Sequence, residues 1–124
     1  MTIAYLCVFI TILLTYITVL IAKWDKRYDN AYPRAWLDKQ EGQKRRAYYA
    51  HQNGMETFPV FATAVIIAHQ MHAQQSTVDA LAIAFVISRI MYTMCYIFNK
   101  PSLRSVVWFI GLVCTIAIFF SGTF

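Results

Sequence analysis

Charged and amide side chains interrupt an apolar stretch near the middle of the chain. Arg46, Tyr49, Asn53 and Glu56 are separated by three, four and three positions. This spacing places all four on one face of an α-helix. Ionisable groups inside a membrane span are costly and usually face protein or water. The pattern therefore predicts a polar stripe that faces the interior of the protein.

A second stripe is predicted further along the chain. Arg89, Tyr92, Thr93 and Tyr96 follow the i, i+3, i+4, i+7 spacing of one helical face. Counted from the basic end of each expected span, Glu56 lies at roughly 15 Å and Arg89 at roughly 14 Å. We hypothesise that these two charges pair, since each then lowers the other's cost of burial. A pair that only fixes helix register is an equally good interpretation.

Arg104 and Ser105 open the last apolar stretch at the same expected level, and Trp108, one turn later, is expected to border the site. Cations and hydroxyls that converge in this way suit an anionic small molecule.

The elements that position these residues must cross a membrane. The 124-residue chain is 59% hydrophobic and 14% charged, which is too apolar for a soluble domain of this size. The first stretch lacks a basic leader and a clear cleavage site, so we interpret it as a retained helix. We expect one domain over residues 1–124, an all-α integral membrane four-transmembrane-helix bundle, with spans at about 3–22, 46–72, 78–98 and 103–120.

The basic residues predict the orientation of the chain. Lys and Arg gather between the first two spans and near the third connection, whereas residues 72–79 contain neither. Both termini are therefore expected to face away from the cytoplasm. The formal charge of +5 comes largely from the first loop, which is mixed in sign and adjoins the spans. Anionic membrane lipid is a better partner for it than nucleic acid.

The cysteines and histidines do not form a metal motif. The three cysteines, Cys7, Cys95 and Cys114, are odd in number and lack ligand spacing. We expect them to be small packing residues and predict no metal site.

Two segments resemble the membrane-associated proteins in eicosanoid and glutathione metabolism, the MAPEG family. They are Ala50-His-Gln-Asn-Gly-Met-Glu-Thr57 and Arg89-x-x-Tyr92-x-x-x-Tyr96 followed by Arg104-Ser105. In span layout the resemblance covers essentially the whole chain, and the first loop is similar to that of small bacterial members. It implies a homotrimer of four-helix subunits in a bacterial inner membrane, with glutathione held between neighbouring subunits.

The resemblance also implies roles for single residues. Asn53 and Glu56 fall on glutathione-contacting positions, with Glu56 suited to the amino group, and Tyr92 and Tyr96 match contacting tyrosines. Arg104 matches an arginine that stabilises the thiolate, and Ser105 a hydroxyl that assists. The candidate catalytic residues are thus Arg104 and Ser105, and the candidate glutathione-binding residues are Arg46, Asn53, Glu56, Arg89, Tyr92 and Tyr96.

The chain departs from the family pattern in places. Tyr49 and Gln52 stand where prostaglandin E synthase-like members carry arginines, and the connection from Tyr96 to Arg104 is one residue shorter. Arg46, or Arg45 with Lys100, would have to compensate in recognising carboxylates. The family also contains a non-enzymatic lipid-binding activator, so resemblance leaves catalysis open.

The leading hypothesis is a glutathione-dependent membrane transferase or peroxidase that acts on a lipophilic electrophile arriving from the bilayer. The alternative is a non-catalytic membrane protein that binds lipid or another small molecule. A small multidrug-type transporter ranks third, because such transporters carry their essential carboxylate in the first helix, which here contains no acidic residue. A purely structural role ranks last.

Overall fold

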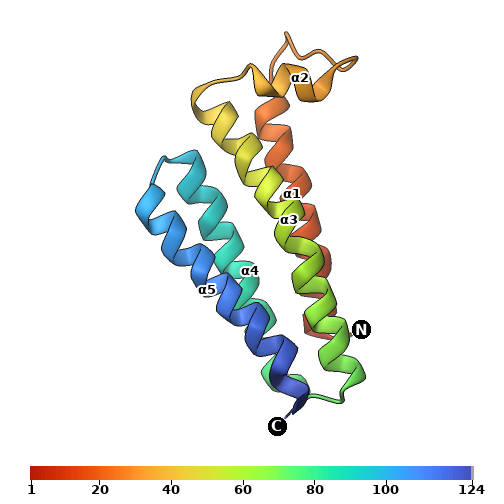
Figure 1. Cartoon of the computed structure of the whole chain (residues 1–124). Helices are drawn as coiled ribbons and strands as arrows, with labels where there is room; N and C mark the ends of the chain where they lie inside the picture. Colours follow the sequence, from red (N-terminus) through yellow and green to blue (C-terminus); the bar gives the residue numbers. More distant parts are fainter. Residues whose placement is uncertain (124) are drawn as a thin grey trace.

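The structure is a computed structural model that describes residues 1–123, and this part of the chain is all-helical (Figure 1). Its elements in chain order are α1 (Ile3–Lys23), α2 (Pro33–Asp38), α3 (Gly42–Gln70), α4 (Gln75–Ile97), α5 (Pro101–Phe120) and the 3₁₀-helix η1 (Ser121–Thr123).

The four long helices run side by side along the length of the molecule. α3 and α4 are central, since each packs against the other and against both α1 and α5. The most extensive contacts join α1 to α3 and α4 to α5. The two chain ends lie at one end of the molecule, and the short α2 lies at the other (Figure 1).

Three helices are long and apolar enough to cross a membrane: α1, α4 and the stretch Pro101–Thr123 that contains α5. The protein is therefore an integral membrane protein. α3 falls outside this criterion because its first half carries the charged and amide residues around Arg46 and Glu56.

Two helices end at residues with left-handed backbone conformation. His72 after α3 and Asn99 after α4 have φ of 57° and 55°. Beyond His72, the Ala73 N–H donates to the Ala68 carbonyl at 3.0 Å, and the residue after Asn99 donates in the same way to Cys95 at 2.8 Å. These bonds satisfy carbonyls that the end of a helix leaves free, as in a Schellman motif.

The helix boundaries differ most from the prediction near the first loop. The span predicted to begin at Arg46 is part of a helix that starts at Gly42, and α2 was not predicted. The boundaries were drawn by long apolar stretches. Residues 42–45 are polar apart from the glycine, and α2, with six residues of mixed composition, is too short to give such a stretch. Gly42 has a φ of +60°, which lets the chain turn sharply between α2 and α3.

The core lies mainly between α3 and α4. Phe61 and Phe85 stack with ring centroids 3.8 Å apart, and both are buried. All three cysteines are buried and free, which confirms that they are packing residues.

α1 and α3 approach each other closely through small residues. Thr11, Thr15 and Thr18 are buried on α1, and the Thr15 hydroxyl donates to the Thr11 carbonyl at 3.0 Å. Across the contact lies Gly54, where an added Cβ would come within 2.8 Å of the Thr15 Oγ1. His51 places its Nδ1 2.8 Å from the Thr15 carbonyl oxygen and adds a second contact.

Replacing Gly54 with alanine is expected to lower the free energy of unfolding by about 1–3 kcal/mol, because Thr15 is buried and must shift. Denaturation of the purified protein in detergent measures this loss. A Thr15→Ala substitution in the same chain should restore part of it, since it makes room for the new methyl group. If Gly54→Ala alone were as stable as wild type, α1 and α3 would be able to move apart at little cost in free energy.

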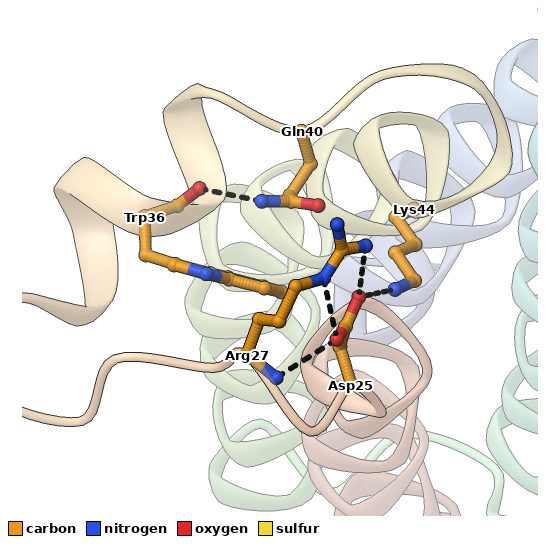
Figure 2. Close-up of polar contacts among 5 residues, drawn as sticks. All are labelled: Asp25, Arg27, Trp36, Gln40 and Lys44. Carbon is orange, nitrogen blue, oxygen red and sulfur yellow. Dashed lines mark hydrogen bonds and ion pairs between the residues drawn. The ribbon is translucent and has the colours of Figure 1, made fainter.

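A polar junction joins the end of α1 to α2 and α3 (Figure 2). The Asp25 carboxylate accepts from the Arg27 backbone N–H at 2.9 Å, from its Nε at 3.2 Å and from its Nη2 at 3.1 Å. Lys44 of α3 also donates to Asp25. The bonds from Arg27 and then Lys44 hold the pKa of Asp25 well below its usual range.

This lowered pKa predicts acid sensitivity. Below the unfolded pKa of about 3.9, the unfolded chain protonates Asp25 before the folded protein does, so stability falls as pH falls. Above that pH the contribution is fully present. We expect Asp25→Asn to unfold at a lower temperature than wild type near neutral pH, with the difference narrowing below roughly pH 4. Melting curves of both proteins across this range provide the test, and a constant difference would contradict it.

Candidate functional site

The predicted site residues come from α3, α4 and α5, and Arg46 links the first two helices. Its Nε donates to the Tyr96 carbonyl at 2.9 Å and its Nη2 to the Ile97 carbonyl at 3.3 Å. These carbonyls belong to the last turn of α4, which has no further intrahelical donors. A cation there also interacts favourably with the helix dipole. Arg46 therefore fixes the end of α4 against the start of α3.

Arginine and tyrosine side chains form a continuous row across α4 and α5, with an arginine at each end and two tyrosines between them. The Arg89 guanidinium lies over the Tyr92 ring at 4.2 Å from its centroid. Tyr92 meets Tyr96 edge to face at 5.4 Å, and the Arg104 guanidinium lies over Tyr96 at 4.1 Å. We call Arg89, Tyr92, Tyr96 and Arg104 the Arg–Tyr row. Each cation is held against the electron-rich face of a ring, which orients it while leaving its N–H groups free to bind an anion.

Arg89 is the most buried cation of the row. The residue is only 4% exposed, and within residues 1–123 its guanidinium has no hydrogen bond or ion pair. A buried charge is costly unless it is paired, and one aromatic ring offsets only part of that cost. An anionic group brought into this region would therefore be held strongly.

Asn53 and Glu56 supply acceptors on α3. The Asn53 Nδ2 donates to the Glu56 Oε2 across a long 3.5 Å. The Asn53 Oδ1 is buried and has no hydrogen-bond partner among the described residues. Glu56 is exposed on the single chain. A free carbonyl oxygen beside a carboxylate suits an ammonium group.

The predicted ion pair between Glu56 and Arg89 is not formed, so that prediction was wrong. The ion pairs within residues 1–123 both involve Asp25. Glu56 and Arg89 instead line one cavity together. Equal depth along two helices does not fix the distance between them, and here Arg89 turns toward Tyr92 on its own helix.

This cavity has a volume of about 180 Å³ and lies among α3, α4 and α5. Trp108 borders it, as expected from its position one turn after Arg104. An apolar groove of about 450 Å³ between α3 and α5 continues from it and shares Val60, Leu112 and Thr115. The complete lining of the cavity is Glu56, Thr57, Val60, Phe85, Arg89, Trp108, Gly111, Leu112 and Thr115.

The apolar residues that line the cavity were not predicted from the sequence, although their helical spacing contains a signal for them. Val60 lies four residues after Glu56, Phe85 four before Arg89, and Leu112 four after Trp108. Each residue extends a predicted stripe by one turn. They were missed because apolar side chains in a span give no contrast with their neighbours.

Ser105 is not brought together with the other candidates in the single chain. It is exposed, and its hydroxyl donates to the Pro101 carbonyl of its own helix at 3.2 Å. A serine at this spacing in a helix readily makes such a bond. Tyr49, one of the departures from the family pattern, is also exposed, with the Arg45 guanidinium 5.8 Å from its ring centroid.

Comparison with known proteins identifies the family of the chain. Searches of curated proteins and of solved structures gave no match. The family model for MAPEG matches residues 3–124, which is nearly the whole chain. The chain therefore belongs to the MAPEG family, the membrane-associated proteins in eicosanoid and glutathione metabolism.

Proposed function

We propose that this protein is a glutathione-dependent membrane transferase or peroxidase that acts on a lipophilic electrophile. The observation that carries the proposal is the Arg–Tyr row, whose buried end at Arg89 opens on a cavity with Glu56 on another helix. Cations and a carboxylate placed on different helices suit a zwitterionic ligand such as this tripeptide.

The residues present fit the charged groups of glutathione. Its ammonium group matches the Glu56 carboxylate and the free Oδ1 of Asn53. A glutathione carboxylate matches Arg89, which lacks an anionic partner among the described residues. Arg104 supplies a cation for the thiolate, since a neighbouring positive charge favours the ionised, nucleophilic form of a thiol.

Two reactions follow from a stabilised thiolate. In a transfer, the sulfur attacks an electrophilic carbon, a C–S bond forms, and the leaving group departs with its electron pair. In peroxide reduction, the sulfur attacks one oxygen and the O–O bond breaks, giving an alcohol and a glutathione sulfenic acid. A second glutathione then reduces that acid, forming a disulfide and water. Tyr96 and Ser105 are the proposed hydrogen-bond donors to the departing group.

The apolar groove supports the second substrate class. It continues from the cavity between α3 and α5 and is lined by residues such as Pro59, Ile116 and Phe119. Because α5 belongs to a membrane-spanning stretch, a lipophilic molecule would reach this groove from the bilayer.

We also propose that the site is completed in a homotrimer of subunits that each cross the membrane four times. The cavity in one chain, about 180 Å³, is smaller than the roughly 300–1,000 Å³ of typical ligand pockets, and Glu56 is exposed. α3 has 29 residues, or roughly 43 Å of helix, which is long enough to be the fourth crossing with its polar face toward the site. We place the protein in a bacterial inner membrane with both termini away from the cytoplasm.

Glutathione binding and turnover by the purified protein test the proposal. Calorimetry measures binding, and two assays follow consumption of a lipophilic aryl halide and of a lipid hydroperoxide. Saturable binding with turnover in either assay supports the proposal. Binding without turnover favours the non-catalytic alternative, for which the outward position of Ser105 is the structural argument. A folded protein that does not bind glutathione would contradict both a glutathione-dependent enzyme and a non-catalytic glutathione-binding protein. It would favour a lipid-binding or transport role.

A further inference from the structure

A further crevice lies at the opposite end of α1 from the chain termini, and none of its lining residues belongs to the Arg–Tyr row. It has a volume of about 470 Å³ and opens between the last turns of α1 and the first turn of α3. One apolar stripe of α1 forms most of it, at i, i+3, i+4 and i+7 spacing. The lining residues are Ile17, Leu20, Ile21, Trp24, Gln43 and Lys44.

The crevice leads into a hollow that carries charge. Lys23, Trp24, Asp25 and Lys26 line this neighbouring hollow, so Trp24 belongs to both. The Trp24 side chain is highly exposed, at 85%. It ends the apolar stripe where α1 itself ends, and tryptophan is typical of the level where hydrocarbon meets the polar headgroups.

The carboxylate in this region is already engaged. Arg27 and Lys44 both donate to Asp25, on either side of it (Figure 2). The Lys23 Nζ lies 5.4 Å from the Tyr28 ring centroid, and Lys26 is exposed and makes no ion pair among the described residues. Two ammonium groups therefore border the hollow without a carboxylate of their own. A requirement for basic loops on one side of the membrane accounts for the lysines, but not for an apolar crevice that ends between them.

We propose that this crevice binds an anionic glycerophospholipid of the leaflet at the basic end of the protein. One acyl chain lies along Ile17, Leu20 and Ile21, and the phosphate sits between Lys23 and Lys26. Both parts of the site match one molecule, because apolar area and clustered lysines together favour anionic over zwitterionic lipid. In a phosphatidylcholine the quaternary ammonium group offsets the phosphate charge, so the lysines gain little from it. This proposal stands independently of glutathione chemistry.

Native mass spectrometry of the delipidated protein, titrated with phosphatidylglycerol or phosphatidylcholine, tests the site. Wild type is expected to retain phosphatidylglycerol in preference. Lys26→Glu should abolish that preference and is expected to fold, because Lys26 is exposed and makes no ion pair among the described residues. Lys23→Gln with Lys26→Gln should weaken phosphatidylglycerol binding by about fivefold for each lysine. The matched control is Arg34→Gln with Lys39→Gln, which removes the same charge from exposed positions on and beside α2.

The control pair makes the result decisive. Loss of the lipid preference in the lysine variants alone supports the site. An equal loss in the control pair would show that the preference depends only on net charge, and would overturn the proposal. Equal retention of phosphatidylglycerol and phosphatidylcholine by wild type would also overturn it. A change in subunit number with lipid retention unaltered would assign the crevice to a contact between copies and would also overturn it.

Discussion

Arg104→Ala is expected to lower the rate of glutathione conjugation by roughly 10²–10³-fold while leaving glutathione affinity nearly unchanged. The Arg104 guanidinium is held 4.1 Å from the centroid of the Tyr96 ring, so its charge is fixed in place before substrate arrives. A preoriented cation stabilises a thiolate more than a mobile one does, because no reorganisation is needed during the reaction. The dependence of rate on pH should also shift upward, since the bound thiol then ionises at higher pH.

Steady-state rates with a lipophilic aryl halide measure this effect. Arg104→Lys should lose less, because lysine keeps the charge but not the planar stack on the ring. Arg34→Ala is the matched control, since Arg34 is an exposed arginine on α2, outside the Arg–Tyr row. If Arg104→Ala retained the wild-type rate, or lost affinity and rate in equal measure, the assignment of Arg104 to the thiolate would be wrong.

Glu56→Gln is expected to weaken glutathione binding by roughly tenfold to a hundredfold, with a much smaller change in kcat. The carboxylate would lose its ion pair with the tripeptide's ammonium group, whereas the neighbouring Oδ1 of Asn53 would still accept one hydrogen bond. KM should therefore rise while the chemical step, which takes place at the sulfur, is largely preserved.

Binding of glutathione acetylated on its amino group distinguishes loss of the contact with Glu56 from a general disturbance of the site. Wild type and Glu56→Gln should bind the acetylated tripeptide with the same affinity, because the group that Glu56 recognises is gone. Glu41→Gln is the control for loss of a carboxylate, since Glu41 is exposed and precedes α3. A Glu56 variant that binds both ligands as wild type does would remove Glu56 from the site.

The proximity of the α4 residues in the Arg–Tyr row can be predicted from the sequence, but the geometry of the cavity cannot. Arg89, Tyr92 and Tyr96 share a helical face by spacing alone, so their proximity could be predicted. The distance between Glu56 and Arg89 could not, because it depends on the residues packed between the helices. Between α3 and α4 lies the stacked pair of Phe61 and Phe85, with ring centroids 3.8 Å apart.

The fold, too, has parts that could be predicted from the sequence and parts that could not. The long apolar helices were predicted because membrane spans are marked by composition alone. α2 was missed because six residues of mixed composition carry no such mark, and its position depends on contacts across the junction with Lys44. Ser105 was assigned to the site by resemblance, but the direction of its hydroxyl is set by the nearby Pro101 carbonyl.

The close approach of α1 and α3 has a consequence for the evolution of the family. A methyl group at Gly54 would occupy the volume that the Thr15 side chain fills, so the sizes of residues 15 and 54 are not free to vary independently. Among relatives, a bulkier residue at position 54 should coincide with a smaller one at position 15. Substitutions at position 15 of α1 are thereby constrained by α3, the helix that carries Asn53 and Glu56.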